Sequence, residues 1–214
     1  MTSSQTNNKN NFNELADNSA VLKTINSLKA NGFLPITVST KEEAFEKIQD
    51  IIPSDASVMN GTSATLKEIG YIDYLKEGQH KWNNLHEKVL AELDPEKQSK
   101  LRKTSVISDF YLGSAHAVTQ NGEILIASNT GSQLPHLVFT SQNIIFVVGA
   151  QKIVTDLDEA FKRLEEHVIP LEDERMKGVY GVGTTHAKTL ILHKENPMMG
   201  RQIYVIIVNE KLGF

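Results

Sequence analysis

The segment NGTSATLKEIG (Asn60–Gly70) contains residue types that bind anions. A short apolar run precedes it and a helical pattern follows, so the Gly-Thr-Ser turn should present free backbone N–H groups at the positive end of a helix. Gly61 would let the backbone approach a ligand closely. The hydroxyls of Thr62, Ser63 and Thr65 would add further donors. A simple capped strand-to-helix turn has the same pattern, and no Gly-Lys-Ser/Thr motif follows to indicate a P-loop.

A second polar segment, GSAHAVTQNGEILIASNTGS (113–132), contains three glycines, several hydroxyls and one histidine, His116. Such a cluster at the carboxyl end of a strand is typical of a pocket for a small anion. We expect it to face the first loop and to contribute four ligand-binding residues: Asn121, Gly122, Ser128 and Gly131. A hairpin with a glycine-rich connection is an equally good interpretation, because Asn-Gly between two β-like runs favours a tight turn.

A third segment, GVYGVGTTHAKT (178–189), has glycines at the wrong spacing for a dinucleotide-binding loop. It also fails as a Walker A motif, since Ala187 stands where a glycine must precede Lys188. A glycine-rich loop that brings His186 and Lys188 to a ligand is still compatible with the sequence. The seven histidines show no close metal-ligand spacing, so no metal site is predicted.

The composition narrows the function classes. The chain has 214 residues, a net charge of −4 and an isoelectric point near 6.0, which argues against binding to nucleic acid or to an anionic membrane surface. It has no cysteine, so it cannot itself hold a disulfide, a thiolate nucleophile or a cysteine-ligated iron–sulfur cluster, and no cofactor is predicted. The start lacks an apolar leader, which predicts a cytoplasmic protein with a disordered polar tail over residues 1–11.

The elements that must position these segments follow a strand–helix–strand–loop–helix order. The patterns predict a helix over 14–31, a strand at Leu34–Ser39, and a strand at Ser57–Asn60 that leads into the first loop. This order favours a parallel α/β sheet. Residues 71–104 show helical spacing and no strand pattern, so we expect a helical segment within a single domain over 12–214.

The chain resembles the LUD (lactate utilization) domain family, which includes the LutC-like proteins. The resemblance extends over residues 32–214 and is most specific in SDFYLGSAHAVTQNGEILIASNTGSQLPHLVFTSQNIIFVVGAQKIV, ERMKGVYGVGTTHAKTLILHKE and QIYVIIVNEKLGF. It implies the fold shared by glucosamine-6-phosphate deaminase, ribose-5-phosphate isomerase and the CoA transferases. That fold is an α/β three-layer sandwich with a mainly parallel sheet, here with an inserted helical segment.

The resemblance also implies a function. The family is associated with oxidation of L-lactate to pyruvate in a complex whose other members carry iron–sulfur clusters. The expected role is a small-anion-binding subunit or accessory, with an iron–sulfur oxidoreductase subunit as partner and a homo-oligomer as a further possibility. The alternative is a free-standing isomerase or hydrolase acting on a sugar phosphate or a similar anionic metabolite.

One motif bears on catalysis. CoA transferases of this fold resemble one another around a Glu-Asn-Gly whose glutamate is the nucleophile. If Gln120-Asn121-Gly122 corresponds to that motif, an amide replaces the attacking carboxylate and no acyl anhydride can form. This correspondence therefore predicts that the chain has no CoA-transferase activity.

Overall fold

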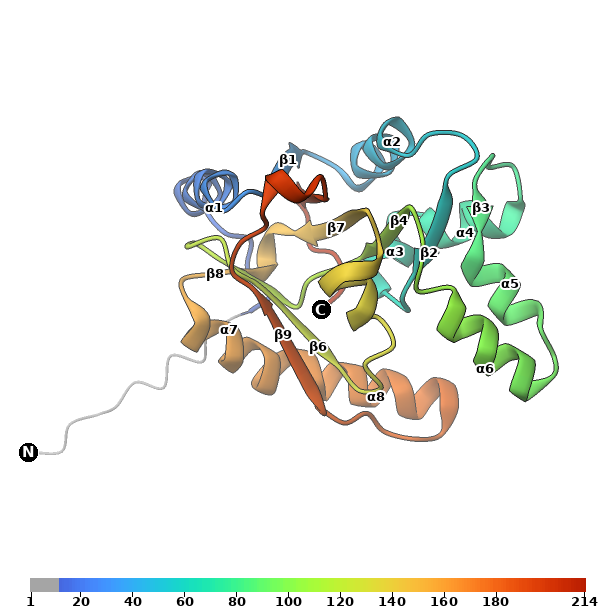
Figure 1. Ribbon diagram of the computed structural model, residues 1–214. Helices are drawn as coiled ribbons and strands as arrows, with labels where there is room; N and C mark the ends of the chain where they lie inside the picture. Colours follow the sequence, from blue (N-terminus) through green and yellow to red (C-terminus); the bar gives the residue numbers. More distant parts are fainter. Residues whose placement is uncertain (1–11) are drawn as a thin grey trace, which may run out of the picture.

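The computed structural model describes residues 12–214, so the predicted disordered tail lies outside the described part. Its centre is a six-stranded sheet in which every neighbouring pair is parallel (Figure 1). The strands in spatial order are β1 (Leu34–Val38), β10 (Gln202–Val208), β7 (Asn143–Gly149), β4 (Phe110–Gly113), β2 (Ser57–Asn60) and β3 (Asn83–Asn84). The predicted α/β fold with a mainly parallel sheet is therefore confirmed.

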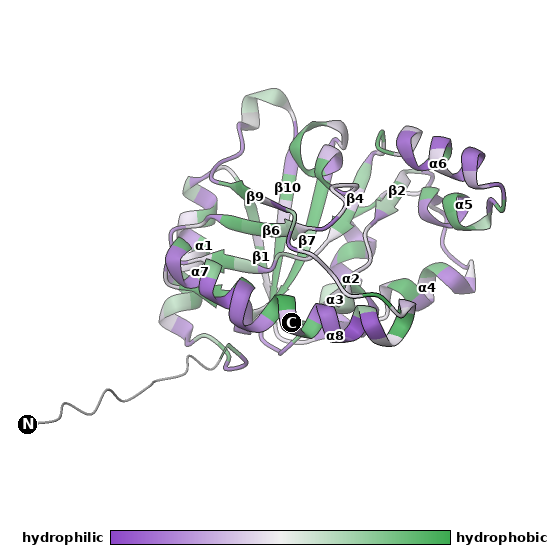
Figure 2. Ribbon diagram, turned by 90° about the horizontal axis from the view of Figure 1, so that it is seen from below, coloured by the Kyte–Doolittle hydropathy of each residue, from purple (hydrophilic) through white to green (hydrophobic). Residues whose placement is uncertain are grey.

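Two interior strands, β7 and β10, are apolar runs after their first residue because both of their faces are covered. All residues of β7 except its first are buried, and Figure 2 shows β7 and β10 as largely hydrophobic. Helices α2 (Lys41–Ile51), α3 (Ala64–Glu68) and α4 (Tyr71–Glu77) pack on one face through residues such as Ile48, Leu66 and Leu75. The other face packs against α1 (Asn18–Ala30) and a second, smaller sheet.

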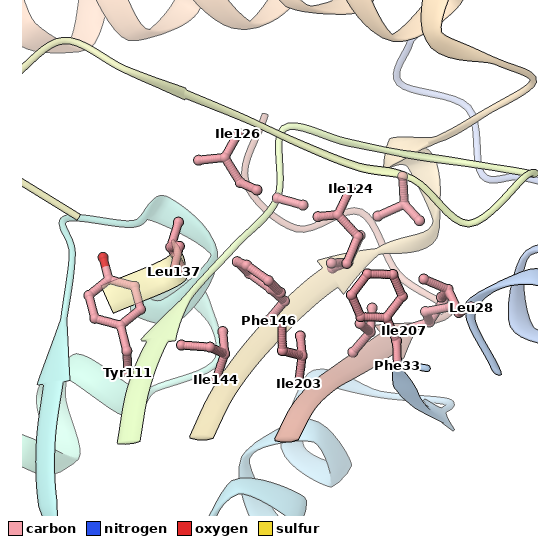
Figure 3. Packing of buried hydrophobic residues seen from close by; sticks show 14 of the residues in the cluster. Leu28, Phe33, Tyr111, Ile124, Ile126, Leu137, Ile144, Phe146, Ile203 and Ile207 are labelled. Carbon is pink, nitrogen blue, oxygen red and sulfur yellow. The ribbon is translucent and has the colours of Figure 1, made fainter. Parts of the chain in front are cut away.

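The second sheet has four strands and forms the next layer. Its order is β8 (Ile153–Val154), β5 (Ala117–Thr119), β6 (Ile124–Ser128) and β9 (Lys188–Leu192). Figure 3 shows Ile124 and Ile126 of β6 facing Phe146 of β7 across the layer boundary. The outer face of the second sheet is covered by α7 (Leu157–Arg163) and the π-helical turn η3 (Leu164–Val168). The predicted hairpin is present between β5 and β6, with Gly122 at φ 83°.

Residues 71–104 are helical as predicted, with one difference. The helices are α4, α5 (Leu85–Ala91) and α6 (Pro95–Thr104), but β3 lies between α4 and α5 and adds an edge strand beside β2. This strand is only two asparagines long, and the second of them also caps α5 by accepting a hydrogen bond from Glu87 N. Strand periodicity cannot show in two polar residues, and this explains the missed strand.

The order of strands creates a crevice. Strands β2 and β4 are neighbours in the sheet. After β2 the chain continues to β3 at the edge of the sheet, whereas after β4 the next strand of this sheet is β7, on the opposite side. Neighbouring strands whose connections leave in opposite directions open a crevice at their carboxyl ends, where open α/β sheets bind ligands. Of the helices in residues 12–214, none combines the length and apolar character needed to cross a membrane.

Candidate functional site

A pocket of about 660 Å³ opens at the carboxyl ends of β2 and β4. Its floor comes from the loops that follow these strands, including Asn60–Thr65 and Gly113–His116, and from Lys152 just beyond β7. Residues 127–130 at the end of β6 form one wall. Helix α8 (Ile169–Tyr180) and the loop 184–186 form another, so both sheets contribute to one site.

Lys152 is the only described lysine that lines this pocket, and it is 2% exposed. Its Nζ donates one hydrogen bond to Thr65 Oγ1 at 3.0 Å and one to Ser114 Oγ at 3.1 Å. Among the described residues, no carboxylate lies within 4.0 Å of Nζ. A buried ammonium without an acidic partner is costly, and this cost favours either loss of its proton or arrival of an anion.

The two hydroxyls that hold Lys152 are themselves oriented. Thr65 Oγ1 donates to the carbonyl of Leu212 at 3.3 Å, and Ser114 Oγ donates to the carbonyl of Ala115 at 3.2 Å. Because each hydroxyl proton is already used, both oxygens act as acceptors toward Nζ. Only two of the three N–H donors of an ammonium are satisfied in this way. The third N–H is bound by neither hydroxyl, and Lys152 lines the pocket, so a ligand there could bind it.

A second buried cation strengthens the positive potential. Arg163, the last residue of α7, is fully buried, donates through Nη1 to the carbonyl of His116, and leaves Nε and Nη2 without a partner in the described residues. Desolvation and, to a smaller extent, the charge of Arg163 lower the pKa of Lys152 to about 7, although the carboxylate of Glu68 acts in the opposite direction. Near neutral pH the lysine is therefore divided between its charged and neutral forms.

His116 lies beside Lys152 in a neutral state. Its Nδ1 accepts a hydrogen bond from the backbone N–H of Ala127 at 3.1 Å, so the ring proton belongs on Nε2. Desolvation, followed by the charges of Lys152 and Arg163, lowers the pKa of His116 to about 3. The ring is thus a hydrogen-bond donor at physiological pH and does not act as a base there.

The rim of the pocket is also basic. Arg102 of α6 and Arg175 of α8 line it, with Glu172 as the acidic neighbour. Glu172 is already bound by Arg175 through two hydrogen bonds of 2.6 and 2.7 Å. Together with Lys152, the lining therefore carries an excess of positive charge, although the whole chain is acidic. Such an excess attracts anionic ligands.

The first predicted loop behaves in part as expected. Strand β2 leads through Gly61 into α3, which starts at Ala64. The oxygen of Ser63 caps this helix by accepting a hydrogen bond from Leu66 N at 3.2 Å. Thr65 turns its hydroxyl to Lys152 and not to open solvent. The strongest anion-binding feature here is therefore the lysine that the loop holds, because α3 is too short to have a large dipole.

Gly61 is required by a close contact. A Cβ atom at this position would lie 2.6 Å from the Oη of Tyr111, a buried side chain that stacks on the ring of His136 with centroids 4.5 Å apart. Tyr111 Oη makes no hydrogen bond of good geometry among the described residues, although the backbone of Gly61 lies close enough to act on it. The glycine and the tyrosine hydroxyl thus occupy complementary space at the pocket floor.

This contact predicts a non-additive pair of substitutions. Gly61→Ala should lower the free energy of unfolding by about 1–3 kcal/mol, because it overpacks a buried site. Tyr111→Phe alone should leave stability unchanged or raise it, since it removes an unpartnered hydroxyl. In the Tyr111→Phe background, Gly61→Ala should cost less than about 1 kcal/mol. Denaturant unfolding of the four proteins measures this coupling, and equal losses in both backgrounds would contradict it.

The structure brings together six of the ten predicted ligand residues. The residues that line the pocket are Gly61, Thr62, Ser63, Thr65, Ser128 and His186. Gly131 and Lys188 lie next to this wall: Gly131 N donates to Ser128 Oγ at 3.0 Å, and Lys188 Nζ donates to the carbonyl of Asn129 at 3.1 Å. Neither of these two is part of the lining.

Asn121 and Gly122 lie elsewhere, so the expected approach of the hairpin turn to the first loop is wrong. The side chain of Asn31, which follows α1, donates to the carbonyls of Asn121 and Gly122. A Cβ at Gly122 would lie 2.7 Å from the backbone of Ser27. The turn is at the opposite end of β6 from Ser128, and it is held there because Gly122 allows close contact with α1.

The same placement corrects the expectation about CoA transfer. Gln120 precedes this turn, and its backbone N–H pairs with the carbonyl of Val154 in the second sheet. It is not among the residues that line the pocket. Because Gln120 lies outside the pocket, it does not occupy the position of a catalytic nucleophile. Its amide therefore neither supports nor excludes CoA-transferase activity. Among residues 12–214, no three His, Asp or Glu side chains gather where they could hold a metal ion.

Comparison with known proteins adds the family. The model of the LUD domain matches residues 21–208. The chain belongs to the LUD domain family. A solved relative in fold, a DUF162 family protein from Deinococcus radiodurans, superposes with a TM-score of 0.56 at 14% identity, covering 92% of this chain and all of that one. At that identity the similarity concerns the fold, and it agrees with the sandwich described above. No curated protein matches the chain.

Several polar residues in and around this LUD domain site were not predicted from the sequence. Lys152, Ser114 and Arg163 were not singled out, and His116 was only noted within its segment; of these four, Lys152 and Arg163 are buried. One signal was present: Lys152 stands between two buried β runs, in VVGAQKIV, where a lysine is unusual. Its hydroxyl partners come from distant segments, so spacing along the chain could not reveal the cluster.

Proposed function

We propose that this LUD domain protein binds a small anionic metabolite, a carboxylate or a phosphate, in the pocket at the carboxyl ends of β2 and β4. The observation that supports this most directly is Lys152, a buried ammonium held by two hydroxyl oxygens with no acid within 4.0 Å in the described residues. A ligand anion would supply the missing partner. Arg102 and the N–H donor of His116 would assist from the rim and the floor.

We further propose a LutC-like role in lactate utilization, which the family implies. In that role the protein is a ligand-binding subunit or accessory of an L-lactate-oxidising system. Because the chain has no cysteine, an iron–sulfur centre of such a system would belong to a partner subunit. The test is to purify a tagged form of this chain from the source cells and to identify an untagged partner that co-purifies. Iron and sulfide should then be found in the complex and not in this chain alone.

A second candidate is a free-standing enzyme that acts on a sugar phosphate or a similar metabolite. The size of the pocket favours it, since about 660 Å³ is typical of sites for ligands larger than a three-carbon acid. The two candidates differ in what the isolated chain does. A subunit should bind ligand without turnover until its partner is added, whereas an isomerase or hydrolase should convert a sugar phosphate alone.

The binding proposal predicts a ligand-dependent rise in thermal stability. Screening should include 2-hydroxy acids, sugar phosphates and inorganic phosphate; a binding anion at about ten times its Kd should stabilise the protein by about 1.4 kcal/mol. The same anion should give no stabilisation of Lys152→Met, which keeps the length of the side chain and removes the charge. Lys211→Met, a change at an exposed lysine outside the pocket, is the matched control and should respond like the unmodified protein.

Two results would count against the proposal. One is a panel in which no anion raises the midpoint. The other is an anion that stabilises Lys152→Met as strongly as it stabilises the unmodified protein, because binding would then take place away from the buried lysine.

A further inference from the structure

The surroundings of Lys152 point to chemistry beyond ionic binding. Thr65 Oγ1 and Ser114 Oγ both accept from Nζ, since their own protons are directed to backbone carbonyls. A neutral amine has two N–H donors and one lone pair. These two acceptors therefore satisfy a neutral amine completely and leave its lone pair for the pocket. The same cradle would leave an ammonium with one N–H unsatisfied.

We propose that Lys152 forms an imine with a small carbonyl compound that also carries an acid group, such as a 2-oxo acid or an aldehyde acid. The inference rests on the proposed anion-binding function, because the acid group must be held in the same pocket. It is independent of whether the protein works alone or with a partner.

The charges around the lysine support this role. Nucleophilic lysines are kept partly neutral by burial and by a neighbouring cation. Both are present here: Lys152 is 2% exposed, and the guanidinium of Arg163 is fully buried nearby without a carboxylate within 4.0 Å in the described residues. The pKa of about 7 for Lys152 agrees with this environment.

The step balances without an oxidant or a reductant. The lone pair of Nζ attacks the carbonyl carbon, a C–N bond forms, and a proton passes from nitrogen to the former carbonyl oxygen, giving a carbinolamine. Loss of that oxygen as water gives the imine. Ser114 Oγ lies 3.1 Å from Nζ and can relay the proton if its own hydroxyl turns from the carbonyl of Ala115 to the substrate oxygen, and the Nε2–H of His116 is a neutral donor on the same floor. Arg102 at the rim supplies positive charge for the acid group.

Reductive trapping tests the proposal on the full chain. Incubation with glyoxylate and cyanoborohydride near neutral pH should leave one carboxymethyl group on the protein, mapped by peptide mass spectrometry to Lys152. Exposed lysines with a pKa of about 10.4 are less than about 0.1% neutral at pH 7, so labelling at Lys152 should exceed that at any exposed lysine at least about tenfold. Lys152→Met should lose this label, and Lys211→Met should keep it.

Glycolate, which has the acid group and an alcohol in place of the carbonyl, separates the two proposals. It should bind, leave no adduct and slow the trapping of glyoxylate. Stabilisation by glycolate with no adduct from glyoxylate would overturn the imine and leave anion binding intact. An adduct at Lys152 without any stabilisation by glycolate would support the imine and count against the anion site. Equal labelling of Lys152 and the exposed lysines would overturn the imine proposal. This outcome can be read from the unmodified protein, without any variant.

Discussion

The affinity of the pocket for a carboxylate should fall about a hundredfold between about pH 6 and about pH 9, if binding requires the protonated form of Lys152. Desolvation, then the charge of Arg163, lowers the pKa of this lysine to about 7. Most of it is therefore an ammonium at the lower pH and a neutral amine at the higher. Binding of the anion should raise the pKa of Lys152, so a proton is taken up on binding near neutral pH.

Calorimetric titration with glycolate measures this effect, because that carboxylate stays ionised over the whole range. Lys152→Met should bind weakly with an almost flat profile. A tight, pH-independent affinity in the unmodified protein would contradict the prediction. The pH dependence of folding is opposite to that of binding. Because the pKa of Lys152 is lower in the folded state than in the unfolded state, its protonation destabilises the folded state at low pH. That penalty from Lys152 should decrease as pH rises from about 7 toward about 10.5.

Gly149→Ala should lower the free energy of unfolding by about 3 kcal/mol or more, because backbone atoms of a neighbouring segment leave no room for a methyl group. Gly149 ends β7, and a Cβ there would lie 2.2 Å from Gln151 Oε1, 2.7 Å from the carbonyl oxygen of Glu210 and 2.8 Å from Leu212 N. The last two are backbone atoms, so a change of rotamer cannot relieve the contact. The C-terminal segment would have to move away, and with it the carbonyl of Leu212 that orients Thr65 Oγ1.

Gly113→Ala is the matched control, because Gly113 ends the neighbouring strand β4 and its Cβ would meet only the ring of Tyr111, at 3.4 Å. Its midpoint should stay within a few degrees of that of the unmodified protein. For a chain of this size, Gly149→Ala should lower the midpoint by about 6–12 °C. Thermal unfolding of the three proteins makes the comparison, and similar midpoints for both variants would refute the close packing at the end of β7.

Local patterns in the sequence carried most of the fold. After their first, polar residue, β7 and β10 are apolar runs, and this pattern indicates strands buried on both faces. The Gly-Thr-Ser turn predicted that a helix follows it, and α3 begins at Ala64; Asn-Gly at 121–122 predicted a hairpin, which is also present. These features depend on residues within a few positions of one another, so one-dimensional reasoning finds them. The edge strand β3 was not predicted, because a strand of two residues is too short to show an alternating hydrophobic pattern.

The site depended on information of another kind. Sequence alone placed Gly61–Thr65 at a strand end and pointed to residues 113–132, and part of each segment does line the pocket. It did not decide which end of the hairpin would face the loop, and the turn at Asn121–Gly122 is held on α1 instead. Only the tertiary structure brought Thr65 and Ser114 to Lys152. Along the chain, Thr65 is 87 positions and Ser114 is 38 positions away from this lysine. The physical reason is that the burial of a charge depends on what packs around it in space, and parallel strands bring distant segments to one edge of the sheet.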